Sequence, residues 1–173
     1  LQERGADVTL VLGPVNTSFD LAGLKVERVQ TAKEMYEACI RSFPDCDITV
    51  MAAAVADYTP TDVAGEKIKK KEDQWSLNFA RTTDILKSLG EKKKNGQVLV
   101  GFALETNNEK VNALDKMKSK NADIIVLNSL QDKGAGFGHD TNKISLFYKN
   151  GDGQDFAIKT KTDVAKDIVD AII

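Results

Sequence analysis

Short apolar runs alternate with amphipathic stretches along most of the chain. The apolar runs are rich in β-branched residues and are too short to be typical helices, so they indicate buried strands. In the stretches between them, apolar residues recur roughly every three or four positions, as on one face of a helix. This alternation predicts an α/β fold with a largely parallel sheet and helices on both faces. The predicted strands are residues 8–12, 25–29, 47–55, 98–104 and 123–127, and the predicted helices are residues 32–43, residues 83–94 and a third that ends near residue 120.

Polar residues mark the positions where these helices begin. A Ser or Thr followed three residues later by Glu is a capping box, in which the two side chains bond each other's backbone N–H groups. At the predicted helix starts this spacing is found at Thr31/Glu34 and at Thr106/Glu109. We expect the helices to be capped by Thr31, by Thr82 or Thr83, by Thr106 and, in a final helix that runs to Ile172, by Thr162.

Two segments depart from the alternation. Periodicity fails across residues 57–74, and so long an unpatterned segment predicts a mobile flap, with residues 75–80 as a possible strand after it. Near the C-terminus, residues 144–148 and 156–158 flank the turn residues 150–153, which predicts an antiparallel hairpin at the sheet edge.

The first six residues look like the end of a helix. Gly5 closes this turn, and the first predicted strand follows at once. We therefore expect residues 1–173 to be a single domain that lacks an upstream strand, a loop and most of a helix.

Composition narrows the classes of function. A net charge of −2 provides no basic surface for nucleic acid, whose binders usually carry one. Cys39 and Cys46 form no CxxC pair, and the single His139 does not complete a Cys/His zinc set, so we expect both thiols to be reduced and structural. The longest apolar stretch, residues 48–56, is far shorter than a membrane helix. We expect a cytoplasmic protein that binds neither membranes nor nucleic acid.

Candidate ligand-binding residues follow the predicted strands. In open parallel sheets, ligands bind beyond the carboxyl ends of the strands. Small residues around Ala53 would let a ligand approach the backbone, Asp57 could bind a ribose hydroxyl or Mg²⁺, Lys67 could bind a triphosphate, and Phe102 could lie beside a base. The same residues also fit a solvated aspartate, a solvated lysine run and a core phenylalanine, and composition alone favours these interpretations.

Other sequence patterns give weaker evidence for a binding or catalytic site. Lys116 and Lys120 are four residues apart on one predicted helix and could meet a single polyanion, but their position away from Val111, Leu114 and Met117 favours a solvated face. The glycines of residues 134–138 do not lie between a strand and a helix, so the dinucleotide fingerprint fails. The chain has no phosphate-binding Walker loop. It also has no GxSxG and no His to serve as a general base with Ser or Cys, which excludes hydrolase triads.

Three motifs together carry a family resemblance. AAVADY occupies residues 53–58, EKIKK residues 66–70 and GFALETN residues 101–107, and the pattern GF-x-x-D-x-N follows at Gly136, Phe137, Asp140 and Asn142. Over nearly its whole length the chain resembles phosphopantothenoylcysteine synthetase, the bacterial phosphopantothenate-cysteine ligase of coenzyme A synthesis.

The resemblance implies a Rossmann-like homodimer that couples 4'-phosphopantothenate to L-cysteine. CTP in bacteria, or ATP in eukaryotes, would act with Mg²⁺. The substrate carboxylate would attack the α-phosphate to give an acyl-cytidylate and pyrophosphate, and the cysteine amine would then displace the nucleoside monophosphate. FMN would belong only to a possible N-terminal decarboxylase domain.

The resemblance also implies roles for particular residues. Lys67 would be catalytic, contacting the phosphates and the charge that develops on them, and the basic stretch after it would act as a flap. Lys116 and Lys120 match two nucleotide-contacting lysines of the family, which replaces their interpretation as a solvated face. The implied nucleotide contacts are Ala52, Ala53, Asp57, Lys67, Thr83, Asp84, Ile85, Leu86, Phe102, Lys116 and Lys120, and no metal ligand is assigned.

The chain departs from the family pattern in places. Thr82 and Thr83 stand where the family usually has Asn-Pro, and Ser129 replaces the usual Asp after Asn128. The family's upstream glycine-rich loop is absent. An NAD(P)-dependent oxidoreductase of Rossmann type is the alternative, although the sequence lacks its GxGxxG motif. A nucleic-acid-binding module that uses the lysines of residues 67–71 is disfavoured by the net charge.

Overall fold

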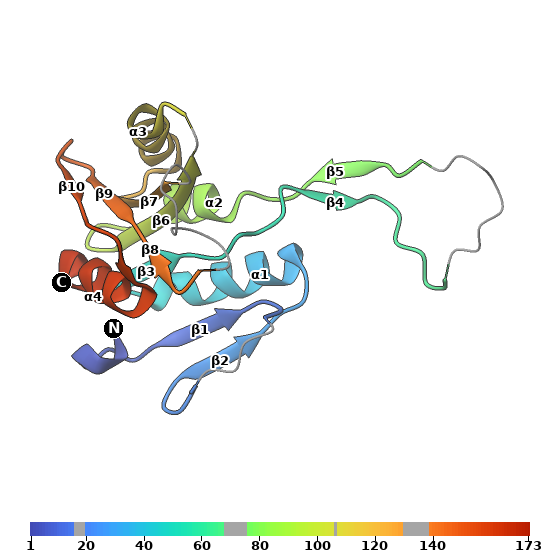
Figure 1. Cartoon of the computed structure of the whole chain (residues 1–173). Coiled ribbons are helices and arrows are strands. Elements are labelled where there is room, and N and C mark those ends of the chain that lie inside the picture. The colour runs from blue at the N-terminus through green and yellow to red at the C-terminus, as the bar shows by residue number, and fades with distance from the viewer. Residues whose placement is uncertain (16–19, 68–75, 106, 130–138) are drawn as a thin grey trace.

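A five-stranded sheet forms the centre of the computed structural model, which describes residues 1–15, 20–67, 76–105, 107–129 and 139–173 (Figure 1). Its strand order is β10-β9-β7-β6-β3. The three strands β3, β6 and β7 are parallel, and β9 and β10 continue the sheet as an antiparallel hairpin. The strands are β3 (Ile48–Met51), β6 (Val98–Glu105), β7 (Ile124–Ser129), β9 (Ile144–Tyr148) and β10 (Gly153–Asp155).

Three strand pairs lie outside this sheet. They are the parallel pair β1 (Thr9–Leu12) and β2 (Lys25–Arg28), and the antiparallel pairs β4 (Tyr58–Pro60) with β5 (Phe79–Arg81) and β8 (Thr141–Asn142) with β11 (Lys159–Thr160). The helices are η1 (Gln2–Arg4), α1 (Ala32–Ser42), η2 (Phe43–Asp45), α2 (Ile85–Lys92), α3 (Glu109–Lys120) and α4 (Lys161–Ile172).

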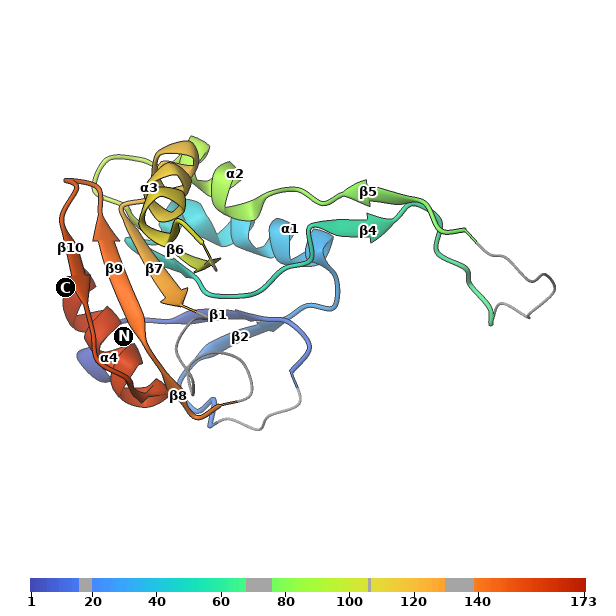
Figure 2. The same ribbon diagram turned by 45° about the horizontal axis from the view of Figure 1, so that its top comes forward.

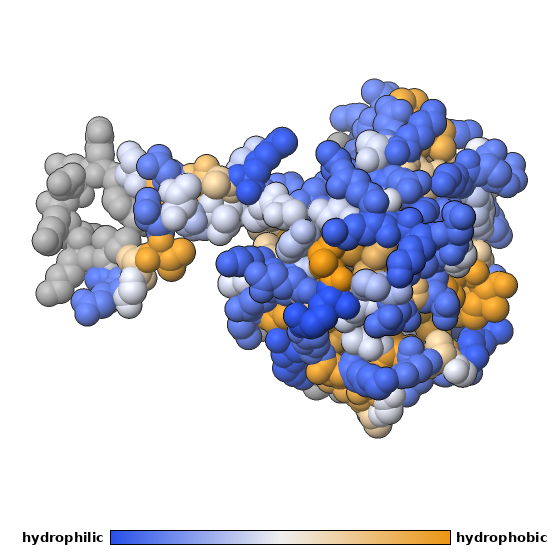
Figure 3. Space-filling model, turned by 180° about the vertical axis from the view of Figure 1, so that it is seen from behind, coloured by the Kyte–Doolittle hydropathy of each residue, from blue (hydrophilic) through white to orange (hydrophobic). Residues whose placement is uncertain are grey.

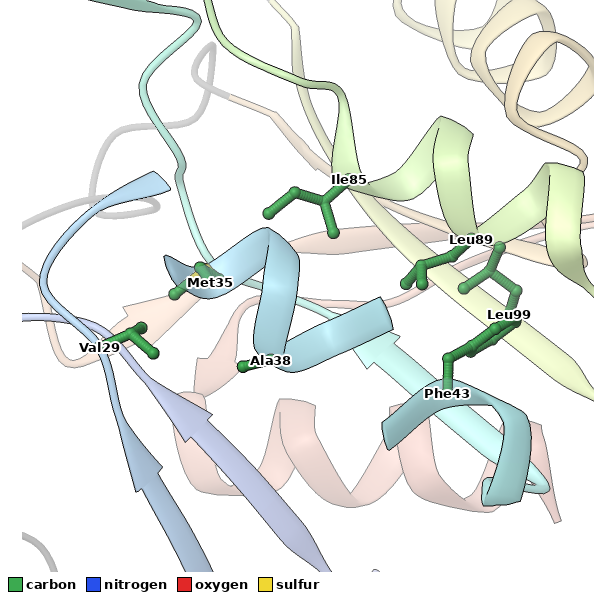
Figure 4. Packing of buried hydrophobic residues seen from close by; sticks show 7 residues of the cluster. All are labelled: Val29, Met35, Ala38, Phe43, Ile85, Leu89 and Leu99. Atoms are coloured by element: carbon green, nitrogen blue, oxygen red, sulfur yellow. The ribbon is translucent and has the colours of Figure 1, made fainter. Parts of the chain in front are cut away.

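Helices cover both faces of the central sheet (Figure 2). Because side chains alternate along a strand, β6 sends Leu99 and Ala103 to one face and Val100 to the other. On the first face, Leu99 packs with residues of α1 and α2 (Figure 4), and Ala103 packs with α3. On the second face, Val100 packs with α4. The predicted Rossmann-like α/β fold, with a mostly parallel sheet and a C-terminal hairpin, is confirmed.

Helix caps were predicted correctly at one site and wrongly at others. At Thr31 the capping box forms, with the Glu34 N–H donating to Thr31 Oγ1 at 3.1 Å. Asp84, and neither Thr82 nor Thr83, caps α2, and Thr160, not Thr162, caps α4. Asn108 begins α3 without a capping bond from its side chain, and Thr106 lies outside the described residues. In both corrected cases, several residues that could act as a cap stand close together. The sequence does not show at which of them the helix begins.

The segment predicted to be an unpatterned flap contains an ordered strand. Tyr58–Pro60 pairs with Phe79–Arg81, and the two strands form an arm that projects from the body (Figures 1 and 2). The strand predicted at residues 75–80 is therefore displaced toward Arg81. Trp75 and residues 68–71 lie outside the described residues. Pairing with a distant segment creates β4, so local periodicity does not reveal it.

Two further strand bounds differ from the prediction. The strand predicted at residues 47–55 ends at Met51, where the chain leaves the sheet toward the arm. The second hairpin strand is Gly153–Asp155, not residues 156–158. The turn sets this register, because Gly151 has φ of 94° and the Tyr148 N–H donates to Asp152 O at 3.0 Å.

Candidate functional site

The carboxyl end of β3 lies beside the middle of β6. Met51, the last residue of β3, is paired with Gly101 of β6. Ala52 and Ala53 follow immediately and are exposed, so a ligand can approach the backbone there. Phe102 is only partly exposed, because its ring packs against the cluster that includes α4. The sequence interpretation of Phe102 as a core residue therefore fits its side chain.

The N-terminus of α2 lies beside the same strand end. Ile85 is buried and Leu86 is partly buried, while Thr83 is exposed. Leu86 packs on Gly101, where an added Cβ would lie 2.6 Å from Leu86 Cδ2. Ile85 and Leu86 therefore have core side chains, and a ligand could meet only their backbone N–H groups, which lie in the first turn of α2 and have no partner within the helix.

Lys116 and Lys120 bring positive charge to this end of the sheet. Lys116 Nζ donates to the Phe102 carbonyl oxygen at 2.8 Å, and Lys120 Nζ lies 2.6 Å from Asp84 Oδ2. The apolar face of α3 differs from the prediction, because Val111 is 60% exposed whereas Ala113 and Met117 are buried. The protein-facing side of the helix is thus rotated, and it includes both lysines instead of leaving them on a solvated face.

Asp84 links the two helices electrostatically. Its Oδ1 accepts from the Lys87 N–H at 2.9 Å, and its Oδ2 accepts from Lys120. Burial acts to raise the pKa of Asp84, but the hydrogen bonds from Lys120 and Lys87 and the charges of Lys120 and Lys116 outweigh it and lower that pKa. The carboxylate is therefore held ionised between the helix N-terminus and the lysines.

Asp84→Asn tests the contribution of this charge to stability. Asn keeps the helix cap, so the variant loses the ion pair and we expect it to be less stable at pH 7 by roughly 0.5–1 kcal/mol, since the pair is partly exposed. A lowered folded-state pKa stabilises above the unfolded pKa, and this stabilisation is lost as pH falls through the folded-state value. The difference in urea midpoint between wild type and variant should therefore shrink below about pH 4. Asp115→Asn, in an exposed carboxylate on α3, is the control and should show a smaller difference at pH 7.

A close approach between α2 and α3 fixes the position of Lys120. A Cβ added to Gly90 would lie 1.8 Å from the Lys120 carbonyl oxygen, and Asn121 Nδ2 donates to the Gly90 carbonyl at 2.9 Å. Lys93 Nζ, on an 8% exposed side chain, donates to Asp123 and to the Asn121 carbonyl. The sequence interpretation missed all of these. A glycine inside a helical pattern, which is unfavourable there, was the available signal.

Gly90→Ala should therefore destabilise the protein. The new methyl group overlaps backbone atoms of α3, so the helices must separate, and overpacking of this kind costs about 1–3 kcal/mol. This outweighs the gain of up to about 1 kcal/mol in helix propensity. Urea unfolding provides the measurement. Gly65→Ala is the matched control because nothing lies within 4 Å of its added Cβ, and an unchanged midpoint for Gly90→Ala would contradict the close approach.

Asp57 and Lys67 belong to the arm. The Thr82 N–H donates to the Asp57 carbonyl at 2.9 Å, and Thr82 Oγ1 donates to the Ala56 carbonyl at 2.6 Å. These bonds hold the base of the arm next to the segment that leads into α2. Lys67 lies further along, exposed after β4, and among the described residues it contacts none of the other candidates. Asp84, Lys116 and Lys120 thus lie together beside β6, Asp57 lies next to the segment that leads into α2, and Lys67 stands apart from them.

Asn128 and Asn142 form a second polar contact at the strand ends. Asn142 is 8% exposed, and its Nδ2 donates to Asn128 Oδ1 at 3.0 Å. This bond joins the end of β7 to β8, and the Lys161 N–H donates to the Asp140 carbonyl beside it. Gly136 and Phe137, the other members of this motif, lie outside the described residues.

The described residues contain no group of three or more His, Cys, Asp or Glu side chains that could hold a metal ion. Within the same part of the chain, no helix is long and apolar enough to cross a membrane. Cys39 and Cys46 are free thiols, and burial raises the pKa of each, as expected for structural rather than reactive cysteines.

Comparison with known proteins identifies the family of this chain. The family described as DNA/pantothenate metabolism flavoprotein C-terminal domain matches residues 1–173. The coenzyme A biosynthesis bifunctional protein CoaBC of Bacillus subtilis is 43% identical over 98% of this chain and 42% of its own length. A cysteine/cysteine sulfinic acid decarboxylase of an unknown prokaryotic organism is 49% identical over 98% of this chain and 47% of its own length. The chain thus spans about half the length of these relatives.

A solved structure of a related protein has the same fold. The crystal structure of the C-terminal domain of a coenzyme A biosynthesis bifunctional protein CoaBC superposes with a TM-score of 0.81 and 33% identity. The match covers 99% of this chain and 75% of that one. The chain therefore belongs to the DNA/pantothenate metabolism flavoprotein C-terminal domain family, the family of the phosphopantothenoylcysteine synthetase domain that its motifs resemble.

Proposed function

We propose that this chain is the ligase domain that couples 4'-phosphopantothenate to L-cysteine in coenzyme A biosynthesis, through an acyl-cytidylate formed from CTP. The observation that carries the proposal is the pair Lys116 and Lys120, one helical turn apart. Lys116 donates to the Phe102 carbonyl of β6, and Lys120 donates to Asp84 at the N-terminus of α2. Two cations next to the free N–H groups of a helix N-terminus suit a polyphosphate.

The nucleotide would lie across the ends of β3 and β6. Its phosphates would meet Lys116, Lys120 and the first N–H groups of α2, and its remainder would lie against the backbone at Ala52 and Ala53. Lys120 is paired with Asp84, so phosphate binding would exchange one anionic partner for another. Asp57, at the base of the arm, is the described carboxylate placed to accept a ribose hydroxyl.

The chemistry would proceed in two balanced steps. A carboxylate oxygen of 4'-phosphopantothenate attacks the α-phosphorus, and the bond to the leaving pyrophosphate breaks. The cysteine amine then attacks the activated carbonyl carbon, loses a proton and expels CMP. The first step brings an anion to a polyanion, so it needs positive charge near the α-phosphate. Lys67 would supply this charge once the arm lies over the nucleotide, and closure would exclude water from the acyl intermediate.

Mg²⁺ would accompany the nucleotide. Mg²⁺ keeps several waters and is commonly held by phosphates with only one or two carboxylates. The described residues contain no preformed cluster of carboxylates, which fits that manner of binding, and Asp57 is a candidate ligand. The ion would neutralise phosphate charge during attack.

We expect a homodimer, with the arm as the contact. Apolar side chains stand exposed along this arm, apart from the body (Figure 3). They are Tyr58 at 53%, Val63 at 84%, Leu77 at 46% and Phe79 at 55% exposure. Apolar groups gathered on a projecting element are typical of a protein interface. In a longer bifunctional protein, FMN would belong to a decarboxylase domain outside this chain.

Thermal unfolding with CTP, ATP or NAD, each with Mg²⁺, tests the proposal. A ligand at about 100 times its Kd stabilises the folded state by about 2.7 kcal/mol. CTP should raise Tm more than ATP does, and replacement of Lys116 and Lys120 by alanine should abolish the shift. Stabilisation by NAD alone would instead favour the oxidoreductase, and a CTP shift that survives the double replacement would contradict the assigned site.

A further inference from the structure

Glu105 is the last residue of β6, in a segment that continues past the last pairing of β6 with β3, at Gly101. It belongs to the GFALETN motif, but it has no part in the proposed nucleotide site. Side chains alternate along a strand, so Glu105 faces the same side of the sheet as Ala103, which packs with α3. Its side chain is partly exposed, and a ligand can therefore reach the carboxylate.

Asn112 of α3 fixes the position of this carboxylate. Its Nδ2 donates to Glu105 Oε2 at 3.0 Å and to the Asn107 carbonyl at 3.0 Å. The second bond ties the amide to the backbone just before the helix, so the group that holds Glu105 is itself held. Neither bond brings a positive charge to the carboxylate, whereas Asp84 is paired with Lys120. The negative charge of Glu105 is therefore left for a ligand.

Asn112, Lys116 and Lys120 form one row along α3, because residues four apart on a helix have Cβ atoms about 5–6 Å apart. The two lysines donate to β6 and to the N-terminus of α2, and Asn112 donates to Glu105. The row thus carries positive charge over the proposed phosphate site and holds a negative charge one helical turn toward its N-terminus. A substrate bound at the phosphate site is within reach of both.

A carboxylate in this place suits one group among the reactants of the proposed ligase. CTP and 4'-phosphopantothenate bring phosphates and a carboxylate, and Glu105 repels all of these. The α-ammonium of cysteine is the cationic group, and a carboxylate binds an ammonium by a charge-assisted hydrogen bond. We propose that Glu105 binds this ammonium and accepts a proton from its nitrogen as the amide forms, and that Asn112 positions the Glu105 carboxylate. This inference rests on the proposed function and assigns its amino-acid site.

The second step of the ligation needs a proton acceptor. The ammonium first gives one proton to water and becomes an amine. The lone pair of the amine then forms the bond to the activated carbonyl carbon, and the bond from that carbon to the phosphate oxygen breaks, with its electron pair leaving on CMP. The nitrogen at this stage carries one proton more than the amide keeps, and Glu105 accepts it. General base catalysis of this kind contributes about 100- to 10,000-fold to a rate.

The two steps, measured separately, test the proposal. Glu105→Gln keeps the shape of the side chain and an acceptor oxygen for Asn112, but it removes the charge. With CTP, Mg²⁺ and 4'-phosphopantothenate alone, the variant should release pyrophosphate at the wild-type rate. With cysteine added, its kcat/KM for cysteine should fall by about 100-fold. Asp115→Asn, which removes an exposed carboxylate of the same helix, is the control and should leave both steps unchanged.

Hydroxylamine in place of cysteine separates formation of the acyl-cytidylate from its use. Hydroxylamine carries no charge at neutral pH, so it should trap the intermediate as a hydroxamate equally in wild type and in Glu105→Gln. Asn112→Ala leaves the carboxylate unpositioned, and it should raise the KM for cysteine by about 10-fold while pyrophosphate release stays unchanged.

Two results would overturn the proposal. If Glu105→Gln slows pyrophosphate release as much as it slows ligation, Glu105 acts on the nucleotide or on Mg²⁺. If kcat/KM for cysteine equals that of the wild type, Glu105 has no part in the amino-acid site. A wild type that releases no pyrophosphate with CTP would instead contradict the proposed function, and this inference with it.

Discussion

Lys67→Ala should lower the rate of CTP-dependent ligation by about 100- to 1000-fold, the usual loss when one group that stabilises developing charge is removed. The expected cause is the loss of the cation that approaches the α-phosphate only when the arm closes. Lys67 is fully on the surface in the described state, so the free energy of unfolding should stay unchanged. Pyrophosphate release, followed in single turnover with CTP and 4'-phosphopantothenate, measures the step itself.

Two further variants of the arm test whether the loss of rate comes from the positive charge of Lys67. Lys67→Arg keeps the positive charge and should recover part of the rate. Glu66→Gln alters the neighbouring side chain, which is also exposed, and should have little effect. If Lys67→Ala raises only the KM for CTP and leaves kcat intact, Lys67 contributes uniform binding and its catalytic role is wrong.

Lys120→Ala should weaken CTP binding by about 10- to 100-fold, and more than Lys116→Ala does. Both variants remove a cation from the phosphates. Removing Lys120 additionally leaves the Asp84 carboxylate, now without its partner at 2.6 Å, next to those phosphates. The double variant Lys120→Ala/Asp84→Asn should therefore bind CTP more tightly than Lys120→Ala alone.

Isothermal titration with CTP and Mg²⁺ provides the measurement. Lys118→Ala is the control, because Lys118 lies on the same helix with an exposed side chain. It should bind CTP as the wild type does. If Lys118→Ala weakens binding as much as Lys120→Ala, the effect arises from the general field of the helix, and the specific site on its inner face is wrong.

The elements that local pattern dictates were predicted from the sequence. The buried strands are apolar along their length, so β6 and β7 appear close to their predicted places. The capping box at Thr31 depends only on residues three apart, and it forms as predicted. Asp84, Lys116 and Lys120 were indicated by motif resemblance, whereas the residues taken alone favoured a solvated face for both lysines.

The missed features depend on contacts between distant segments. Strand β4 forms because it pairs with β5 in the arm. An unpatterned stretch of sequence separates these two strands, so the pairing was not predicted. The rotated inner face of α3 is set by contacts such as the one between Gly90 and the Lys120 carbonyl. Val111 looked like a core residue by spacing alone, but it lies on a side of α3 that the other described elements leave exposed. Strand pairing and the buried face of a helix depend on which elements pack together, and a single sequence does not identify those elements.

The ion pair between Lys120 and Asp84 has a consequence for ionic strength. Two lysines and one carboxylate carry a net charge of about +1 before nucleotide arrives, so the site attracts fewer solution anions than two free lysines would. Added salt screens the attraction for phosphate, but it also weakens the competing pull of Asp84 on Lys120. The affinity for CTP should therefore fall less steeply with salt in the wild type than in Asp84→Asn, although the variant binds more tightly at low salt.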